Sequence, residues 1–140
     1  MNITYKMNLA DVNWDEIKTK VAEDDFDNGR TAEQLKKSFE NSFATCIAYE
    51  GDQIIGKARA LSDGVCNAYV VDVWTYTPYR HQGIASQILK HLMVKLEGQH
   101  VYLFTDQDTV PFYQQLGFKE WGIGLGCVVG EWLQPKAENI

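Results

Sequence analysis

The chain lacks any apolar run long enough to cross a bilayer, and its first nine residues lack the basic and apolar regions of a signal peptide. It also lacks excess positive charge. The net charge is -6 and the sequence pI is near 5.0, whereas domains that bind nucleic acids are usually basic. These absences predict a cytoplasmic protein that binds neither membranes nor nucleic acids.

Cysteine and histidine are scarce. The three cysteines, Cys46, Cys66 and Cys127, form no CxxC pair, and the three histidines have no metal-ligand spacing. We therefore expect reduced thiols and no metal site. Two phosphate-binding motifs are missing as well: the chain contains neither G-x-x-x-x-G-K-[ST] nor G-x-G-x-x-G. Their absence argues against an ordinary P-loop enzyme and against a dinucleotide-binding fold.

The remaining composition is that of an ordinary globular domain, with 140 residues, 45% hydrophobic and 23% charged. We expect one domain over residues 1–140. Hydrophobic periodicity and turn residues predict the element order β-α-α-β-β-β-α-β-α-β. The predicted strands cover residues 3–7, 45–49, 53–61, 67–76 and 100–105, with a last strand inside 118–132. A helix is predicted over 86–97, and a short one between Asp108 and Gly117.

Capping residues predict where the first two helices begin. Asn13 precedes Glu16, and Thr31 precedes Gln34, each with the three-residue spacing of a helix N-terminal cap. The apolar stripe that we expect the second helix to bury consists of Leu35, Phe39 and Phe43.

The order of elements predicts an α/β fold. The strands at 67–76 and 100–105 flank the helix at 86–97, so we expect them to be parallel neighbours joined by a right-handed crossover. The earlier strands should form an antiparallel meander. The result is a mixed, mostly antiparallel sheet with helices on both faces.

The loop Tyr79–Ala85 contains the pattern Arg-x-x-Gly-x-Ala between the 67–76 strand and the 86–97 helix. Unpaired N–H groups at the positive end of a helix dipole form a site for a phosphate or pyrophosphate. Gly83 would let the backbone approach such an anion closely. Arg80 either adds a charge-assisted contact to the anion or lies in solvent as a surface charge.

Two segments resemble the GCN5-related N-acetyltransferase (GNAT) family. Val71–Ala85, reading VDVWTYTPYRHQGIA, is similar to its acetyl-CoA signature, and Val110–Phe118 to its second signature, a short helix with Phe-Tyr that closes on Gly-Phe. Ala58–Ala68 and Asp72-Val73 resemble a branch that includes plant-type serotonin (arylalkylamine) N-acetyltransferases and bacterial members of unassigned substrate. The departures from the family pattern, which remove no backbone donor, are Thr75, Thr77 and His81-Gln82.

The resemblance implies acetyl-CoA as co-substrate, no metal, and a V-shaped splay between the two central parallel strands. Strand residues 73–75 would pair with the pantetheine amides, and the loop would bind the pyrophosphate. The implied cofactor-binding residues are Val73, Trp74, Thr75, Arg80, His81, Gln82, Gly83, Ile84, Ala85 and Ser86.

The resemblance also implies that Tyr113 donates a proton or hydrogen bond to the departing sulfur. The alternative is that Tyr113 is a core residue. An attacking amine must first lose a proton, and Asp72 is a candidate base because it interrupts an apolar strand. A structural, hydrogen-bonded Asp72 is an equal alternative, and a water chain could also accept the proton.

The acidic segment 23–27 lies where the family walls its acceptor site. It suits a cationic amine with an apolar body, although such a charge run is also typical of a solvated loop. The substrate-binding candidates are Asp25, Phe26 and Tyr69. We expect a small primary amine, an arylalkylamine or a polyamine, as partner. An acetyltransferase for protein lysines or N-termini, or a non-catalytic acyl-CoA-binding module, stays open, as does a homodimer.

Overall fold

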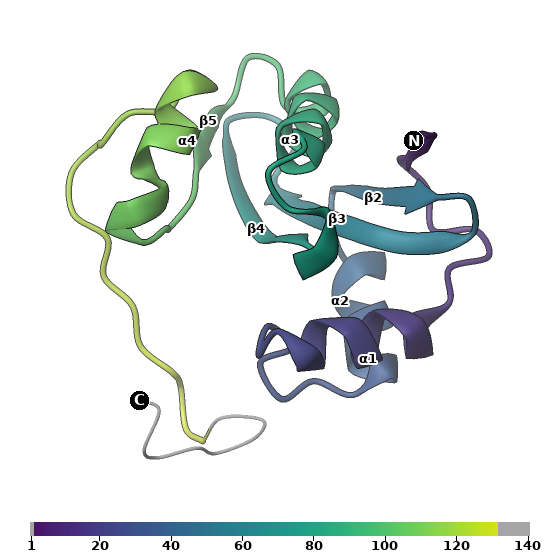
Figure 1. Ribbon diagram of the computed structural model, residues 1–140. Coiled ribbons are helices and arrows are strands. Elements are labelled where there is room, and N and C mark those ends of the chain that lie inside the picture. Colours follow the sequence, from purple (N-terminus) through teal and green to yellow (C-terminus); the bar gives the residue numbers. More distant parts are fainter. Residues whose placement is uncertain (1, 132–140) are drawn as a thin grey trace.

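The computed structural model describes residues 2–131, and its central feature is a five-stranded sheet in the order β1-β2-β3-β4-β5 (Figure 1). The strands are β1 Ile3–Lys6, β2 Ala44–Glu50, β3 Gln53–Ser62, β4 Asn67–Thr75 and β5 His100–Tyr102. Neighbours from β1 to β4 are antiparallel, and β4 and β5 are parallel. The predicted mixed, mostly antiparallel sheet is therefore confirmed.

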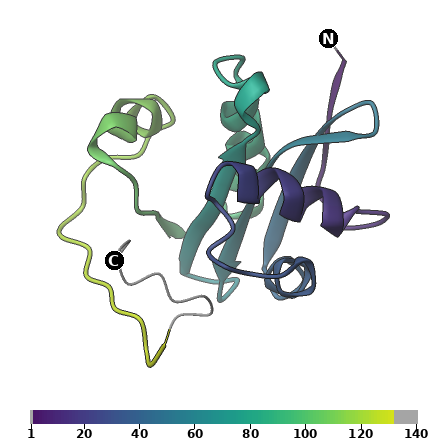
Figure 2. The ribbon, with the colours of Figure 1, turned by 60° about the horizontal axis from the view of Figure 1, so that its bottom comes forward.

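Helices lie on both faces of this sheet (Figures 1 and 2). They are α1 Trp14–Glu23, α2 Ala32–Glu40, α3 Ile84–Lys95 and α4 Val110–Gln115. The first two cover one face, α3 covers the other, and α4 lies beyond β5. None of these described helices combines the length and the apolar character that a membrane crossing requires.

The predicted caps of α1 and α2 are present. The side-chain oxygen of Asn13 accepts a hydrogen bond from the Glu16 N–H at 3.0 Å. Thr31 and Gln34 form a reciprocal capping box, with each side chain bonded to the other residue's backbone N–H. These bonds satisfy donors that a helix N-terminus leaves free, so the local sequence alone decides where both helices begin.

The two faces of β2 bury different layers of the core. Cys46 and Ala48 face α3, where Ile88 is fully buried, while Ile47 faces α1 and α2 beside Leu35. This alternation follows from the two-residue period of a strand. Each buried Ile or Leu side chain contributes roughly 1.5–3 kcal/mol through its removal from water.

Three features of the structure differ from the sequence prediction. Phe43 is 47% exposed, because α2 ends at Glu40 and no longer carries the stripe that far. Strand β5 stops at Tyr102 instead of residue 105. The last strand, predicted within 118–132, is absent from residues 118–131, and residue 132 lies outside the described residues.

The missing last strand has a physical reason in its three alternating glycines, Gly122, Gly124 and Gly126. Glycine contributes no side chain to a sheet surface and loses more backbone entropy than other residues on becoming ordered. Gly122 also has a left-handed φ of 73°, which a regular strand does not accommodate. The segment therefore runs as an extended chain past α4, with residues 121–131 exposed (Figure 1).

Candidate active site

Strands β4 and β5 separate after the third of the nine residues of β4. Their ladder runs from Asn67–His100 to Tyr69–Tyr102 and stops there, although β4 continues to Thr75. The β5-side backbone edge of β4 beyond Tyr69 therefore has no strand partner among the described residues. This confirms the V-shaped splay, and it leaves N–H and C=O groups of β4 free to pair with an extended amide-containing ligand.

The loop after β4 ends at a helix whose N-terminus has no side-chain cap among the described residues. A 3-10 turn at Thr77–Tyr79 leads to Gly83, which caps α3 with a left-handed φ of 79°. Within residues 2–131, no side chain bonds the free N–H groups of the first turn of α3. Apart from the adjoining backbone, no atom of the described residues lies within 4 Å of the position a Gly83 Cβ would take, so the approach is open. Free donors, a helix dipole and open space together fit an anion such as a pyrophosphate.

The Arg80 side chain lies back along β4. Its Nε donates to the Thr75 carbonyl at 3.2 Å, and its Nη2 is 3.6 Å from a carboxylate oxygen of Asp24. Asp24 also accepts hydrogen bonds from Trp74 Nε1 at 2.8 Å and from Thr77 Oγ1 at 2.7 Å. The carboxylate of Asp24 thus fastens the end of α1 to the end of β4 and to the start of the loop.

We expect Asp24→Asn to lower thermal stability, because an amide offers one oxygen where the carboxylate now accepts bonds on both. Hydrogen bonds to charged groups contribute about 1.5–3 kcal/mol each, so a loss of about 1–3 kcal/mol is expected. The adjacent Asp25→Asn is the matched control, since Asp25 is exposed and no hydrogen bond or ion pair of its side chain is found in residues 2–131. Melting temperatures of both variants test this. Equal values for both would contradict the fastening role.

Asp72, the candidate base, is buried and surrounded by cations. Arg30 donates to both of its carboxylate oxygens, at 3.0 and 2.8 Å, and Arg59 Nε donates at 2.5 Å. Burial alone would raise the pKa of Asp72, but the Arg30 hydrogen bonds and the neighbouring positive charges outweigh it and hold the pKa well below its ordinary value. A carboxylate so held is a weak base. These contacts favour the structural interpretation, and the base role stays a prediction.

Lys57 on β3 is fully buried beneath the connection between α1 and α2. Its ammonium lies over the rings of Phe26, Phe39 and Trp74 at 5.3, 5.4 and 5.9 Å from their centres. Burial lowers the pKa of Lys57 to about 8. The positive charges of Arg30 and Arg59 lower it as well, and the negative charge of Asp72 offsets these effects only in part. We call the three rings around the ammonium the aromatic cage of Lys57, and Phe26 is half-buried as one of its members.

Lys57→Met should remove a pH dependence of stability. Between pH 8 and the ordinary pKa of 10.5, the unfolded chain binds more protons at this lysine than the folded chain does, so wild-type stability should rise with pH. Relative to the Met variant, the wild type should gain on the order of 3 kcal/mol across that window. Denaturant unfolding at pH values on both sides of the window measures this difference.

Lys95→Met, which changes an exposed lysine at the end of α3, is the control for that measurement. Tyrosines titrate alike in all three proteins, so their contribution cancels in the differences. A wild-type minus Lys57→Met difference that stays constant with pH would show that Lys57 keeps an ordinary pKa.

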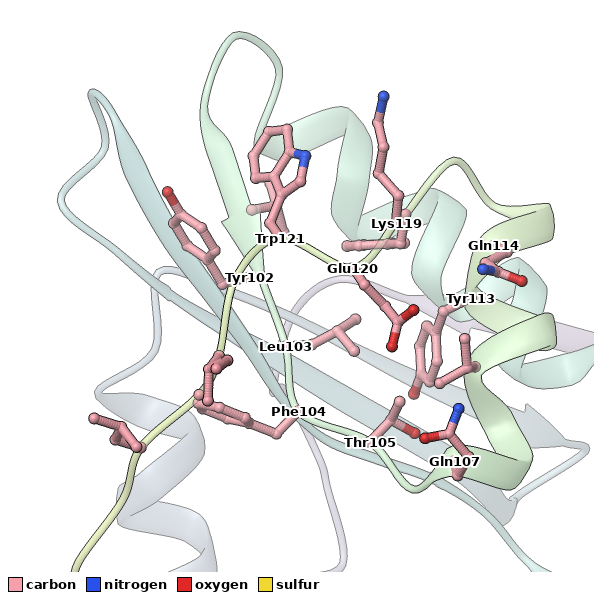
Figure 3. Close-up of a pocket in the computed structure, with 17 residues that line it drawn as sticks. Tyr102, Leu103, Phe104, Thr105, Gln107, Tyr113, Gln114, Lys119, Glu120 and Trp121 are labelled. Atoms are coloured by element: carbon pink, nitrogen blue, oxygen red, sulfur yellow. The ribbon is translucent and has the colours of Figure 1, made fainter.

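Tyr113 lies on α4, half-buried between Phe112 and Phe118. Burial raises the pKa of its hydroxyl, so the phenol stays protonated through the neutral range. The hydroxyl makes no hydrogen bond to residues 2–131 and is directed toward Thr105 and Gln107 (Figure 3). A protonated, unpaired phenol can act as a donor.

Tyr113 lines an open pocket of about 580 Å³ between the end of β5, α4 and the segment after α4 (Figure 3). Phe104 and Trp121 contribute apolar walls, and Glu120 contributes a carboxylate. None of the predicted cofactor-binding residues, 73–75 and 80–86, lines this pocket. The structure thus brings the loop and β4 together. Tyr113 packs against a core cluster that contains the β4 residues Ala68 and Val70 and has Val73 at its edge, but its pocket opens toward β5 and the segment after α4.

The acceptor candidates occupy separate places. Asp25 is exposed, Phe26 belongs to the cage around Lys57, and Tyr69 packs edge-on against Phe104 with ring centres 5.9 Å apart. Most of the acidic segment is occupied: Asp27 pairs with Lys18, and Glu23 accepts from the Tyr76 hydroxyl. The segment is therefore mainly a set of structural contacts.

Sequence reasoning missed three residues that shape this site, Arg30, Lys57 and Arg59, and it included Asp24 only as part of the acidic segment 23–27. One signal was available: Lys57 follows Ile54, Ile55 and Gly56, so it is a charge inside a buried strand, as is Asp72 on β4. Two opposite charges in neighbouring apolar strands suggest a partnership. Within residues 2–131, no group of three or more His, Cys, Asp or Glu side chains could hold a metal ion.

Comparison with known proteins agrees with this geometry. Residues 41–120, more than half of the chain, match the family model of the acetyltransferase (GNAT) domain. The chain is similar to a GNAT-family acetyltransferase of Streptococcus pneumoniae, with a TM-score of 0.78 and 25% identity, covering 93% of this chain and 100% of that one.

Two curated relatives differ in the acceptor that their names state. A histone acetyltransferase of Glycine max is 34% identical over 73 residues, which are 50% of this chain and 32% of that protein. Serotonin N-acetyltransferase 2 of Oryza sativa is 29% identical over 96 residues, 64% of this chain and 48% of that protein. The chain spans about half or less of the length of such curated relatives. From the matched domain and the shared fold, the chain belongs to the GNAT family of acetyl-CoA-dependent N-acetyltransferases.

Proposed function

We propose that this protein transfers an acetyl group from acetyl-CoA to the primary amine of a small molecule, by direct attack in a ternary complex. The observation that carries the proposal is the juxtaposition of two unsatisfied backbone surfaces. In the described part of the chain, the β4 edge beyond Tyr69 has no β5 partner, and the α3 N-terminus behind Gly83 has no capping side chain.

The residues present fit acetyl-CoA. A pantetheine arm carries two amides that can pair with the Val73–Thr75 backbone, and a pyrophosphate can accept from the N–H groups of residues 81–86. Arg80 now bonds the Thr75 carbonyl, so it would have to turn to meet either group. Its half-exposed side chain leaves it free to do so.

Acetyl-CoA supplies an acetyl group activated as a thioester. The neutral amine nitrogen attacks the carbonyl carbon, the carbon–nitrogen bond forms, and the carbon–sulfur bond breaks. The amine's proton leaves to water or to a protein base. The Tyr113 hydroxyl is proposed as the donor to the departing sulfur, whose negative charge develops only late in the reaction.

For the acceptor, an arylalkylamine is the first candidate. The edge-on pair of Tyr69 and Phe104 offers aromatic surface beside the splay, and the rice relative is named for serotonin. A lysine of a protein is the second, favoured by the name of the soybean relative. The predicted homodimer and cytoplasmic location stay predictions.

The test is an acceptor screen that follows release of free CoA thiol from acetyl-CoA. It compares an arylalkylamine, a linear polyamine and a lysine-containing peptide at equal concentrations. The proposal expects fastest release with the arylalkylamine. Faster release with the peptide would select the second candidate. Acetyl-CoA binding without release for any amine would leave a non-catalytic acyl-CoA-binding module.

A further inference from the structure

Strand β4 contains a bulge at Asp72. In the ladder with β3, Lys57 pairs with Trp74 and Arg59 pairs with Val71, so two β4 residues lie opposite one β3 residue. Asp72 is one of those two, and its φ of 61° lies in the left-handed region. A non-glycine residue there is uncommon and is held by its surroundings. Asp72 lies three residues after Tyr69, the last β4 residue that pairs with β5.

A buried ion cluster holds this bulge, and we define it as Arg30, Lys57, Arg59 and Asp72. Its four side chains are between 0% and 13% exposed. Arg30 donates to the Asp72 carboxylate from its two terminal guanidinium nitrogens, Nη1 and Nη2, and Lys57 Nζ donates to the Asp72 backbone carbonyl at 3.2 Å. The carboxylate and the carbonyl of one strained residue are thus both fixed.

The ion cluster joins three separate segments. Arg30 belongs to the connection between α1 and α2 and is itself held by the carbonyl of Asp27. Lys57 and Arg59 belong to β3, and Asp72 to β4. Because buried charges are costly unless fully paired, this arrangement has few alternative geometries. It fixes the direction in which the β4 backbone continues past the bulge.

On the basis of the proposed function, we propose that Asp72 is a positioning residue, which acts through the ion cluster to aim the Val73–Thr75 backbone at the pantetheine arm and acetyl group. It does not exchange a proton with the amine. The lowered pKa agrees with this role, since Asp72 then stays ionised and ion-paired throughout the range in which amines are acetylated.

The test uses Arg30→Lys, which keeps the positive charge but loses the bidentate pair of hydrogen bonds to the Asp72 carboxylate. Calorimetry with CoA and steady-state kinetics with acetyl-CoA are the readouts. We expect CoA affinity and kcat to fall roughly ten- to a hundred-fold, the scale of a small displacement of a binding backbone. The pH at which kcat declines on the acidic side should not move, since Asp72 takes no proton.

Two results would overturn the proposal. CoA affinity and kcat within twofold of wild type would make the ion cluster merely structural. A shift of the acidic limb of the kcat profile in Arg30→Lys would identify Asp72 as the base, because loosening the grip raises its pKa. If Arg30→Lys does not fold, the double variant Asp72→Asn/Arg59→Gln replaces it, with the same expectations for affinity and kcat, because it leaves the net charge of the ion cluster unchanged.

Lys37→Met is the control. It removes an exposed positive charge from α2, and within residues 2–131 the Lys37 side chain makes no hydrogen bond or ion pair with the ion cluster, so CoA affinity should stay within twofold of wild type. Failure of the proposed function gives a different result, because the wild type itself would then bind no CoA or acetylate no amine.

Discussion

Gly83→Asp should abolish the stabilisation of the fold by acetyl-CoA. In the wild type, ligand at a hundred times its Kd should stabilise the native state by about 2.7 kcal/mol and raise the melting temperature accordingly. The aspartate adds a side chain and a negative charge where the backbone faces open space at the N-terminus of α3. Thermal denaturation with and without acetyl-CoA measures the response.

Gly98→Asp is the matched control. Gly98 has a left-handed φ of 84° and open space around its Cβ position, as Gly83 does, but it follows the opposite end of α3. Both variants therefore carry similar backbone strain and the same charge. Only Gly83→Asp should lose the ligand response. A wild-type response in Gly83→Asp would remove the pyrophosphate from this loop.

Local chemistry explains what the sequence could predict. The caps at Asn13 and Thr31 and the loop around Gly83 depend on residues within a few positions of one another, so their structure follows from short-range hydrogen bonds and backbone sterics. The parallel neighbours β4 and β5 follow from the helix between them. The mixed sheet was therefore within reach of sequence reasoning.

Long-range pairing explains what was missed. The grip of Arg30 on Asp72 joins residues 42 positions apart, and Asp24 bonds Trp74 across 50 positions. No periodicity or local motif encodes such contacts. For the acidic segment, the sequence predicts either an acceptor surface or a solvated loop, and it does not show the structural contacts because their partners, Lys18 and Tyr76 among them, lie elsewhere in the chain.

The position of the Tyr113 hydroxyl decides whether it can act as the acid for the departing sulfur. It lines the pocket beyond β5, whereas the candidate cofactor residues lie along β4 and the loop. An acid for the departing sulfur must reach the thioester to within hydrogen-bonding distance. The hydroxyl is free of other partners within residues 2–131, so it has no competing bond to break. Its removal should therefore report on chemistry and hardly at all on folding.

Tyr113→Phe should lower kcat roughly ten- to a thousand-fold and leave acetyl-CoA affinity and the melting temperature near wild type. The reason is that the hydroxyl acts on charge that exists only in the transition state. Single-turnover kinetics isolate the chemical step. Tyr102→Phe is the control, since it removes an exposed hydroxyl from the same pocket and should leave kcat unchanged. An unchanged single-turnover rate in Tyr113→Phe would make Tyr113 a packing residue of α4 and leave the sulfur to be protonated by solvent.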